Sequence, residues 1–600
     1  IFVLLNKFVF SWVIDRFQNK VWPAIQEKYF NIVSSSIKGK RPILVFLGGI
    51  ALLVLSIIFT GIRSPKVDFF PKADPNYIIT YLRMPIGTHQ NVTDSITQVL
   101  EKRIYKVIGN NNPIVQSVIT NVAIGAGTQE DNQTQAMPHL GKVTVAFVQY
   151  AKRNGVSTVD YLAQIREAVK NIPGTEIVVD QEAAGPPTGK PINIEIAGNN
   201  FDELVETSSK LKSFIESKQI PGIEELRSDF QANKPEIVVH VDRRRANQEG
   251  ISTAQVGGEL RTSIFGKEIS KYRDDKDEYK VQLRLQEDQR KDISNILNLP
   301  LTYRDMAMGG RIRQVPLSSI AKVEYSNTYA GIKRINKKRV ITLSSNVLTS
   351  HNANEVVSKI KAQISSFPHS ESISIKMTGE QEDQAETMSF LSKAFLIAFG
   401  MIFLILVLQF NSMSKPAIIL AEIIFSITGV LLGFSLFNMN IVIVMTGVGL
   451  FALAGIIVRN GILLVEFTDI LLSEGMELRA AAAEAAKTRM TPVLLTAIAA
   501  ILGLIPLAVG LNIDFVSLFS TGDPKITIGG DNVAFWGPLS WTMIFGLIFG
   551  TFLTLILIPC MLVMVEKFKE RIFRLFGKEY SAEKAAHERK HHDSLIEEIK

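Results

Sequence analysis

The chain is 600 residues long, 46% apolar and 20% charged, with a formal net charge of +7 and one cysteine. A lone cysteine excludes a disulfide framework and a Cys/His metal cluster. The basic residues gather beside apolar runs, which is typical of membrane proteins, so we expect no nucleic-acid partner. The sequence begins with Ile1 and has no charged leader, and we expect it to be part of a longer polypeptide.

Residues 1–41 come before the first long apolar run, and we expect them to form an amphipathic connecting segment on the cytoplasmic side. Residues 24–37 (AIQEKYFNIVSSSI) place apolar side chains at helical spacing beside lysines, which predicts a helix lying on the inner membrane surface. Residues 1–14 are apolar but interrupted by Lys7, so we interpret them as the tail of an earlier span or as an interfacial helix.

Six stretches are apolar enough to cross a bilayer, which takes about 20 helical residues. They are residues 42–61, 388–410, 417–437, 441–467, 492–511 and 538–566, the last five lying within 388–566. Lysines and arginines gather before residue 42, after residue 566 and in the loops 411–416 and 468–491. By the positive-inside rule, both ends lie in the cytoplasm and 62–387 lies outside. We expect the highly charged tail, 567–600, to be solvated and partly disordered.

The external segment alternates strand and helix signals in a repeated split β-α-β pattern. The first unit occupies 62–188, and after the breaker AGPPTGKP the pattern restarts in 189–239 and 334–387, with EIVVHVD (236–242) read as one of its strands. Residues 240–333 interrupt the second unit as an inserted subdomain. The predicted fold class is therefore an α+β membrane protein, with six transmembrane helices and a large external domain of ferredoxin-like subdomains.

Arg459 is the only basic residue of the stretch 441–467. A cation near the bilayer centre costs about 3 kcal/mol on insertion scales, so we expect its guanidinium to face a protein interior near a carboxylate or water. This indicates a polar relay of the kind found in ion-coupled transporters; the alternative is a structural arginine that ties two helices together. Glu422, near the inner end of its span, is interpreted as a snorkelling or packing residue.

Other motifs carry no chemistry that we can assign. GPPTGK (185–190) lacks the spacing of a phosphate loop, and Pro191 follows where Ser or Thr would bind magnesium. Met306 and Met308 form a pair of soft ligands, but a hairpin turn at the following glycines explains them more simply. The histidines show no metal-ligand spacing and no nucleophile motif is present. We expect no enzyme activity, no cofactor and no metal site.

Several stretches together resemble one family. They are FFPKADPNYIITYLRMPIGT (69–88), GPPTGKPINIEIAG (185–198), DRRRANQEGIS (242–252), GEQEDQ (379–384), GIIVRNGILLVEF (455–467) and RMTPVLLTAIAAILGLIPL (489–507). At these intervals the chain resembles the C-terminal half of a resistance-nodulation-division (RND) efflux permease of the hydrophobe/amphiphile multidrug type. The resemblance covers about residues 20–567.

The resemblance implies a proton-driven pump in the bacterial inner membrane, with residues 62–387 in the periplasm. Such a permease is a homotrimer that works with a periplasmic adaptor (membrane fusion) protein and an outer-membrane channel. Its N-terminal half supplies aspartates, and Arg459 would be their fixed counter-charge, because arginine keeps its proton. Asn460, Arg489 and Thr496 fall on the family's other relay positions.

The resemblance also assigns roles to the external parts. The two split β-α-β units would be porter subdomains, and the insert 240–333 would be the docking subdomain. The loop VAIGAGTQEDNQTQ (122–135) would be the switch loop beside the substrate path, although it lacks the phenylalanines of multidrug members. Its path-lining residues would be Ala123, Ile124, Gly125, Ala126, Gly127 and Thr128.

Three functions remain open at this point. The first is proton-coupled export of amphiphilic compounds. The second is export of heavy-metal cations on the same scaffold, which ordered methionines or carboxylates along a channel would favour. The third is a non-transporting accessory or scaffold protein that uses its external domain to bind protein or lipid.

Overall fold

The computed structural model describes residues 16–71, 73–128, 136–182, 189–231, 234–305, 309–329, 331–348 and 351–575. The predictions for residues 1–14, for Met306 and Met308, for 129–135 of the expected switch loop and for 576–600 of the tail lie outside this part of the chain.

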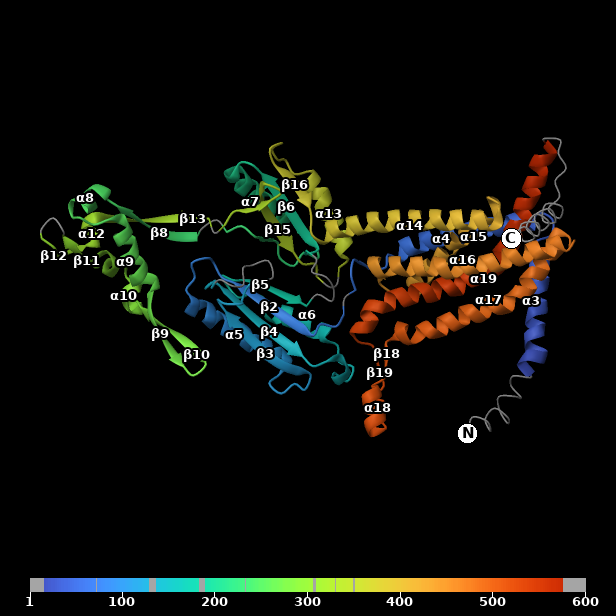
Figure 1. The fold of residues 1–600 in the computed structure, drawn as a ribbon, viewed down its shortest axis with the longest axis horizontal. Helices are drawn as coiled ribbons and strands as arrows, with labels where there is room; N and C mark the ends of the chain where they lie inside the picture. The colour runs from blue at the N-terminus through green and yellow to red at the C-terminus, as the bar shows by residue number, and fades with distance from the viewer. Residues whose placement is uncertain are drawn as a thin grey trace, which may run out of the picture. The chain divides into compact units, whose positions relative to one another are not determined.

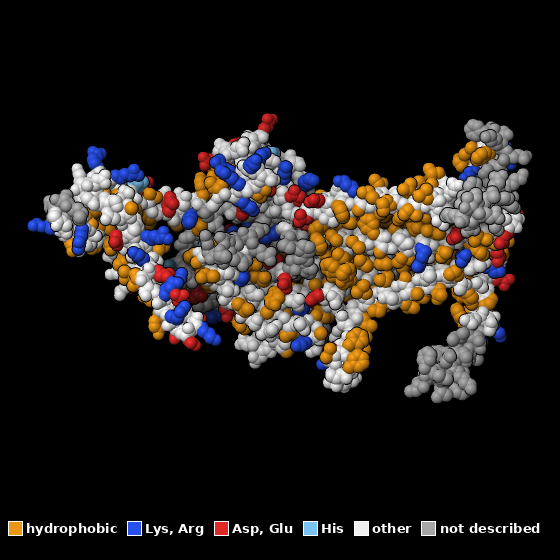
Figure 2. Space-filling view, viewed as in Figure 1, with side chains coloured by type: hydrophobic (Ala, Val, Ile, Leu, Met, Phe, Trp, Pro, Cys, Tyr) orange, Lys and Arg blue, Asp and Glu red, His pale blue; other side chains and the backbone are white. Residues whose placement is uncertain are grey.

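Six of the described helices are long and apolar enough to cross a membrane. They are α4 (Arg41–Arg63), α14 (Glu380–Phe410), α15 (Ser414–Leu436), α16 (Ile443–Ser473), α17 (Leu478–Val509) and α19 (Asp531–Leu575). Each overlaps one predicted stretch, and Figure 1 shows them running side by side. On the face drawn in Figure 2, apolar side chains cover their outer surfaces.

The helices differ in how much of their apolar surface this chain covers. In the most apolar 18-residue stretch of each helix, 67% of the residues of α15 and 61% of those of α19 are buried within this chain. In α4 and in α14 only 6% of these residues are buried. α15, α16 and α17 pack on α19 around a core of aliphatic side chains that includes Ile419, Leu464 and Ile558. α4 and α14 therefore present most of their apolar residues to whatever surrounds this chain.

Two predicted helix boundaries are wrong. The expected loop 468–491 is mostly helical, because α16 continues to Ser473 and α17 begins at Leu478. The alanine-rich stretch from Arg479 to Lys487 has high helix propensity, which extends α17 well before its apolar part. The charged tail is likewise helical as far as Leu575, as a continuation of α19.

A shorter helix crosses the ends of the long ones. The π-helical turn η2 (Phe17–Val21) leads into α3 (Trp22–Ser36), which confirms a helix over most of 24–37. Trp22 Nε1 and Gln26 Nε2 donate to the Thr491 hydroxyl at 3.2 and 3.1 Å. The Tyr29 hydroxyl donates to the carbonyl of Leu555 at 2.7 Å. These contacts hold α3 against α17 and α19; its place on the membrane surface stays a prediction.

The first sheet has four strands in the order β3-β4-β2-β5, with every neighbouring pair antiparallel. The strands are β2 (Tyr77–Arg83), β3 (Val115–Val122), β4 (Leu140–Phe147) and β5 (Glu176–Gln181). Alternate residues of β2, namely Ile78, Thr80 and Leu82, are buried against α5 (Gln90–Ile108) and α6 (Thr158–Ala168). A 3-10 turn, η3 (Tyr150–Lys152), precedes α6.

The second sheet repeats this order. β6 (Ile192–Gly198) lies between β15 (Lys338–Ser345) and β16 (Ser374–Met377). The short strands β7 (Arg227–Ser228) and β14 (Lys333–Ile335) both pair with β15. Helices α7 (Phe201–Ser217) and α13 (Ala353–Ser365) complete this subdomain. In both sheets the first strand in the sequence therefore lies between the last two.

Residues Met84–His89 and Phe230–Lys333 form a separate compact unit. Its strand β8 (Lys234–Val241) pairs along its whole length with β13 (Ala321–Thr328). Its core includes Ile251, Val256 and Leu317. The remaining elements are α8 (Arg243–Gln248), α9 (Thr253–Phe265), β9 (Lys267–Asp274), β10 (Asp277–Leu283), α10 (Glu287–Lys291), α11 (Ile293–Leu297), β11 (Pro300–Asp305), β12 (Arg311–Pro316) and α12 (Leu317–Ile320). The segment 236–242, expected in the second subdomain, thus pairs within this unit.

A backbone clamp joins the end of α4 to the start of α16. β1 (Val67–Asp68) pairs in parallel with β17 (Ile441–Val442). The Asn440 amide donates to the Asp68 carboxylate at 3.2 Å, and the Asn354 amide donates to the carbonyl of Val67 at 3.3 Å. Because Asn354 lies in the first turn of α13, the clamp also holds the second sheet's helix.

Candidate functional site: the exposed face of α16

One face of α16 is left uncovered by the rest of the chain. Its exposed positions from Val448 to Ile470 are three, four or seven residues apart, which places them on a single helix face. Between those ends the exposed residues are Ala452, Gly455, Arg459 and Glu466. A Cβ added at Gly455 would meet no atom within 4 Å. We call this set of four residues the α16 stripe.

Arg459 stands near the middle of the stripe and is exposed. Among the described residues its guanidinium makes no hydrogen bond and no ion pair. From the sequence we expected this guanidinium to face the interior of the bundle. Within this chain alone it does not. The arrangement leaves a permanent cation, flanked by small residues, free to meet a group on another helix.

The other three predicted relay residues lie on α16 and its neighbour α17, each in a different environment. Asn460 is 2% exposed, and its Oδ1 has no hydrogen-bond partner among the described atoms. The Arg489 guanidinium lies 4.5 Å from the ring centroid of Phe467. The Thr496 hydroxyl donates to its own helix, at the carbonyl of Val493, 3.0 Å away. No hydrogen bond or ion pair among the described residues joins any of them to Arg459.

Glu422 on α15 packs against the opposite side of α16, and of the two roles predicted from the sequence, snorkelling and packing, only packing agrees with the structure. Glu422 on α15 does not snorkel, because its side chain is 3% exposed. Neither carboxyl oxygen has a hydrogen bond of normal geometry among the described atoms, although the Thr554 hydroxyl lies beside it. Gly461 makes room for the carboxyl, since a Cβ there would be 2.8 Å from Glu422 Oε2. Only the packing of three helices, which no local pattern reveals, could have shown this burial.

An ion pair joins the first turn of α15 to the last turns of α16. Lys415 is 3% exposed and contacts the carboxylate of Asp469. The sequence suggested only that Lys415 marks the inner side of the membrane. Removing one partner of such a pair would leave an uncompensated buried charge, so the pair fixes these helix ends together.

The described part of the expected switch loop is held at its root. Ala123 adopts a left-handed conformation with φ 65°, and its N–H donates to the carbonyl of Leu140 at 2.9 Å. Its own carbonyl accepts from the N–H of Met137 at 3.0 Å. Ala123, Ala126 and Gly127 are buried and Gly125 and Thr128 half-buried, whereas Ile124 is 65% exposed. Of the six predicted residues, the structure therefore presents the side chain of Ile124.

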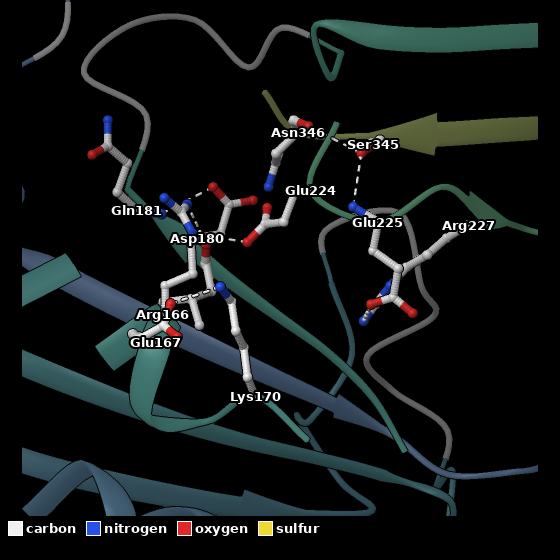
Figure 3. A network of polar contacts seen from close by, with 11 residues as sticks. Arg166, Glu167, Lys170, Asp180, Gln181, Glu224, Glu225, Arg227, Ser345 and Asn346 are labelled. Carbon is white, nitrogen blue, oxygen red and sulfur yellow. Dashed lines mark hydrogen bonds and ion pairs between the residues drawn. The ribbon is translucent and has the colours of Figure 1, made fainter. Parts of the chain in front are cut away.

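The two sheet subdomains meet at a mostly buried ion pair, which Figure 3 shows with its neighbours. Arg166 Nε on α6 lies 2.8 Å from Glu224 Oε1, in the loop that follows α7, and both side chains are less than 15% exposed. Arg166 also donates to the carbonyl of Val179 at 2.9 Å. Burial raises the pKa of Glu224, and nearby Asp180 raises it further, whereas Arg166 and Asn346 lower it. Burial is the largest of these effects.

No group of three or more His, Cys, Asp or Glu side chains within the described ranges could hold a metal ion. Cys560 is a free, buried thiol.

The chain is similar in sequence to several characterised proteins. The chain is 22% identical to multidrug resistance protein MdtC of Erwinia tasmaniensis over 533 residues, 88% of this chain and 47% of that protein. It is 25% identical to swarming motility protein SwrC of Bacillus subtilis over 376 residues, 63% of this chain and 33% of that protein. It is 26% identical to cobalt-zinc-cadmium resistance protein CzcA of Cupriavidus metallidurans over 371 residues, 61% of this chain and 32% of that protein.

The fold is shared with a crystal structure of a heavy metal efflux pump, with a TM-score of 0.71 at 22% identity. That alignment covers 91% of this chain and 52% of the pump chain, so this chain spans about half the length of the proteins it matches, or less. The AcrB/AcrD/AcrF family matches residues 9–566. Because the match covers nearly the whole sequence and the fold agrees, the chain belongs to the AcrB/AcrD/AcrF family of RND permeases, which are inner-membrane transporters.

Proposed function

We propose that this chain is the C-terminal half of a proton-driven efflux permease and that Arg459 is the fixed cation of its proton relay. The α16 stripe carries the proposal. A cation in the middle of an apolar helix is costly unless a carboxylate or water meets it. Small residues beside it let another helix approach closely. The described residues of this chain supply no such carboxylate, so the partner would come from the N-terminal half.

The electrostatics of such a pair support proton coupling. Carboxylates opposite Arg459 are attracted to it when ionised, and this attraction is lost when they take up protons. Because arginine keeps its charge, the protonation state of the carboxylates alone switches the contact. The helices can then shift between two packings. A proton that crosses 100 mV releases about 2.3 kcal/mol, which is the energy available to drive this shift.

Asn460, Arg489 and Thr496 would support the relay without touching Arg459 directly in this half. The unpaired Oδ1 of Asn460 can accept a hydrogen bond from water or from a neutral carboxyl. Arg489, held over Phe467, adds a second positive charge on the neighbouring helix. Thr496 already donates its hydroxyl proton, so it is left as an acceptor.

The external parts follow from the same proposal. Residues 62–387 would lie in the periplasm and both chain ends in the cytoplasm. The two sheets would be the porter subdomains, and the unit built around β8 and β13 would be the docking subdomain. The full permease would be a homotrimer that meets a periplasmic adaptor and an outer-membrane channel. Ile124, exposed beside the buried root of its loop, would contact the substrate.

We propose amphiphilic compounds as substrates, since the chain matches MdtC over most of its length. Heavy-metal cations are the second possibility, favoured by the likeness to CzcA and to a heavy metal efflux pump. The two differ in what should line the porter path: apolar side chains such as Ile124 suit amphiphiles, whereas ordered methionines or carboxylates suit metal ions.

The test is resistance in a pump-deleted strain that expresses the full-length protein, assayed with dyes, detergents, antibiotics and salts of cobalt, zinc and cadmium. We expect Arg459→Ala to abolish resistance while the protein still inserts, and Arg459→Lys to retain part of it because a cation remains. Lys361→Ala, which removes an exposed charge on α13 outside the long helices, is the control and should behave as wild type. Wild-type resistance in Arg459→Ala would disprove the relay.

A further inference from the structure

The segment between α17 and α19 carries a short amphipathic helix with an uncovered apolar face. This helix, α18 (Phe515–Thr521), places Phe515, Val516 and Phe519 on one side, where they are 61%, 80% and 86% exposed. At 100° per residue, Ser517, Ser520 and Thr521 fall on the other side. Ile526 and Ile528, on the segment that returns to α19, are also exposed.

The segment is held rigidly at its base. β18 (Leu511–Asn512) pairs with β19 (Thr527–Ile528). The Asn512 amide donates to the carbonyls of Gly510 and Gly529 at 3.0 and 2.9 Å. Asp514 caps α18 by accepting from the N–H of Ser517 at 3.0 Å. The apolar face is therefore presented by an ordered hairpin.

The polar groups of α18 are satisfied within the segment. The hydroxyl of Ser517 donates to Asp514 at 2.7 Å, that of Ser520 to the carbonyl of Val516 at 2.7 Å, and that of Thr521 to the carbonyl of Ser517 at 2.8 Å. An apolar solvent demands such internal pairing, because it offers no hydrogen bonds. The charged residues Asp523 and Lys525 stand in the turn beyond the helix.

The apolar face continues the outer surface of the long helices. Exposed apolar residues recur from α17 into the hairpin: Leu502, Ile505, Val509, Leu511 and Ile513. Figure 1 shows α18 projecting sideways from the ends of α17 and α19, and Figure 2 shows apolar side chains on it. Trp536, 43% exposed near the same end of α19, is a residue type enriched where a bilayer meets water.

We propose that residues 511–528 lie in the outer leaflet of the bilayer, with Phe515, Val516 and Phe519 among the lipid acyl chains and Asp523 and Lys525 at the headgroups. Continuity with the apolar outer surface of α17 favours lipid over a second copy of the chain. The choice of the outer leaflet over the inner leaflet rests on the proposed topology.

Depth measurement tests the proposal. The protein is prepared with Cys560→Ala and one new cysteine, Phe519→Cys on the apolar face, Ser520→Cys on the polar face, or Asp523→Cys in the turn. Each is labelled with the fluorophore NBD and reconstituted in phosphatidylcholine vesicles. We expect nitroxide-labelled lipid to quench position 519 severalfold more strongly than position 523, and aqueous iodide to show the reverse order, with position 520 between them. Val516→Cys repeats the apolar-face measurement if Phe519→Cys fails to fold.

Two results would overturn the proposal. Iodide quenching as strong at 519 as at 523 would place the face in water. Protection of 519 from both quenchers, together with cysteine cross-linking of two copies at 519, would show that a second copy covers it. An impermeant maleimide applied to intact spheroplasts reports separately on sidedness. If Asp523→Cys reacts only after permeabilisation, the proposed topology fails while the membrane depth of α18 stands.

Discussion

At the residue scale, the contact between Gly461 and Glu422 shows how this chain brings a carboxyl into an apolar bundle. Glu422 lies at the contact of α15 with α16 because Gly461 has no side chain to exclude it. Ile419, one turn earlier on α15, approaches the same glycine. The buried acid therefore depends on a small residue next but one to Arg459, on the opposite side of the helix that carries the proposed relay cation.

Replacing Gly461 by alanine should destabilise the protein. The new Cβ would lie 2.8 Å from Glu422 Oε2 and 3.1 Å from Ile419 Cγ2. Overpacking of this kind costs about 1–3 kcal/mol, which exceeds the gain of about 1 kcal/mol in helix propensity. Gly503→Ala is the control, because a Cβ there meets nothing within 4 Å. Thermal unfolding in detergent should show a lower midpoint for Gly461→Ala alone; equal midpoints would contradict the contact.

At the element scale, the Arg166–Glu224 pair joins α6 of the first sheet subdomain to the loop after α7 of the second. The pair is close enough for a strong attraction, yet the pKa of Glu224 is raised, because burial outweighs the nearby guanidinium. A carboxyl with a raised folded-state pKa binds its proton more readily in the folded than in the unfolded state. Its contribution to stability is therefore present below the unfolded pKa and is lost as pH rises through the folded pKa.

Glu224 should make the protein less stable at neutral than at mildly acidic pH. The relevant window runs from the ordinary glutamate pKa of 4.5 up to the raised value. In Glu224→Gln, which cannot titrate, this part of the pH dependence should disappear. The measurement is thermal unfolding of both proteins at several pH values between 4.5 and 7, with Glu225→Gln on the next residue as the control. An unfolding midpoint that depends on pH equally in the wild type and in Glu224→Gln would contradict this role of Glu224.

The sequence predicted elements better than it predicted their partners. Apolar runs located the six long apolar helices of the described residues, because the requirement for about 20 apolar residues is local. The strand 236–242 was also recognisable, but its alternation fits any half-buried sheet edge, and the choice of β13 as its partner depends on the insert's own core. The burial of Glu422 and Lys415 had no local signal either, since it arises from packing between helices far apart in the chain. Arg459 could be singled out from the sequence because the free-energy cost of a cation in an apolar helix is evident from the neighbouring residues alone.

At the scale of the whole molecule, residues 230–333 of the second compact unit are connected at both ends to strands of the second sheet, and residues 84–89 of the same unit follow β2 of the first sheet. Asp229 accepts from the N–H of Thr342 at 2.7 Å through its side chain, and β14 pairs with the same strand, β15. The chain thus leaves and re-enters the sheet along a single edge. The unit's core, with Ile251, Val256 and Leu317, contains no residue of either sheet.

Replacing residues 231–332 by a short Gly-Ser linker should therefore leave the rest of the chain folded. We expect the shortened protein to insert into membranes, to run as a single species on size exclusion in detergent, and to unfold cooperatively. Deleting residues 201–217 is the contrasting variant. It removes α7, whose buried Leu204, Leu211 and Ile215 cover the second sheet, and it should aggregate. Aggregation of the linker variant would show that the unit is needed for folding.

The clamp between β1 and β17 has a mechanical consequence. The backbone N–H of Ile441 donates to the carbonyl of Lys66 at 2.9 Å, just two residues before α16 begins. On the other side of the clamp, β1 ends at Asp68, and β2 of the first sheet begins nine residues later at Tyr77. Any sliding of α16 along its axis must either tear these peptide hydrogen bonds or drag Val67 and Asp68 with it. An axial movement of the helix that bears Arg459 is therefore transmitted through β1 to the strands of the first sheet.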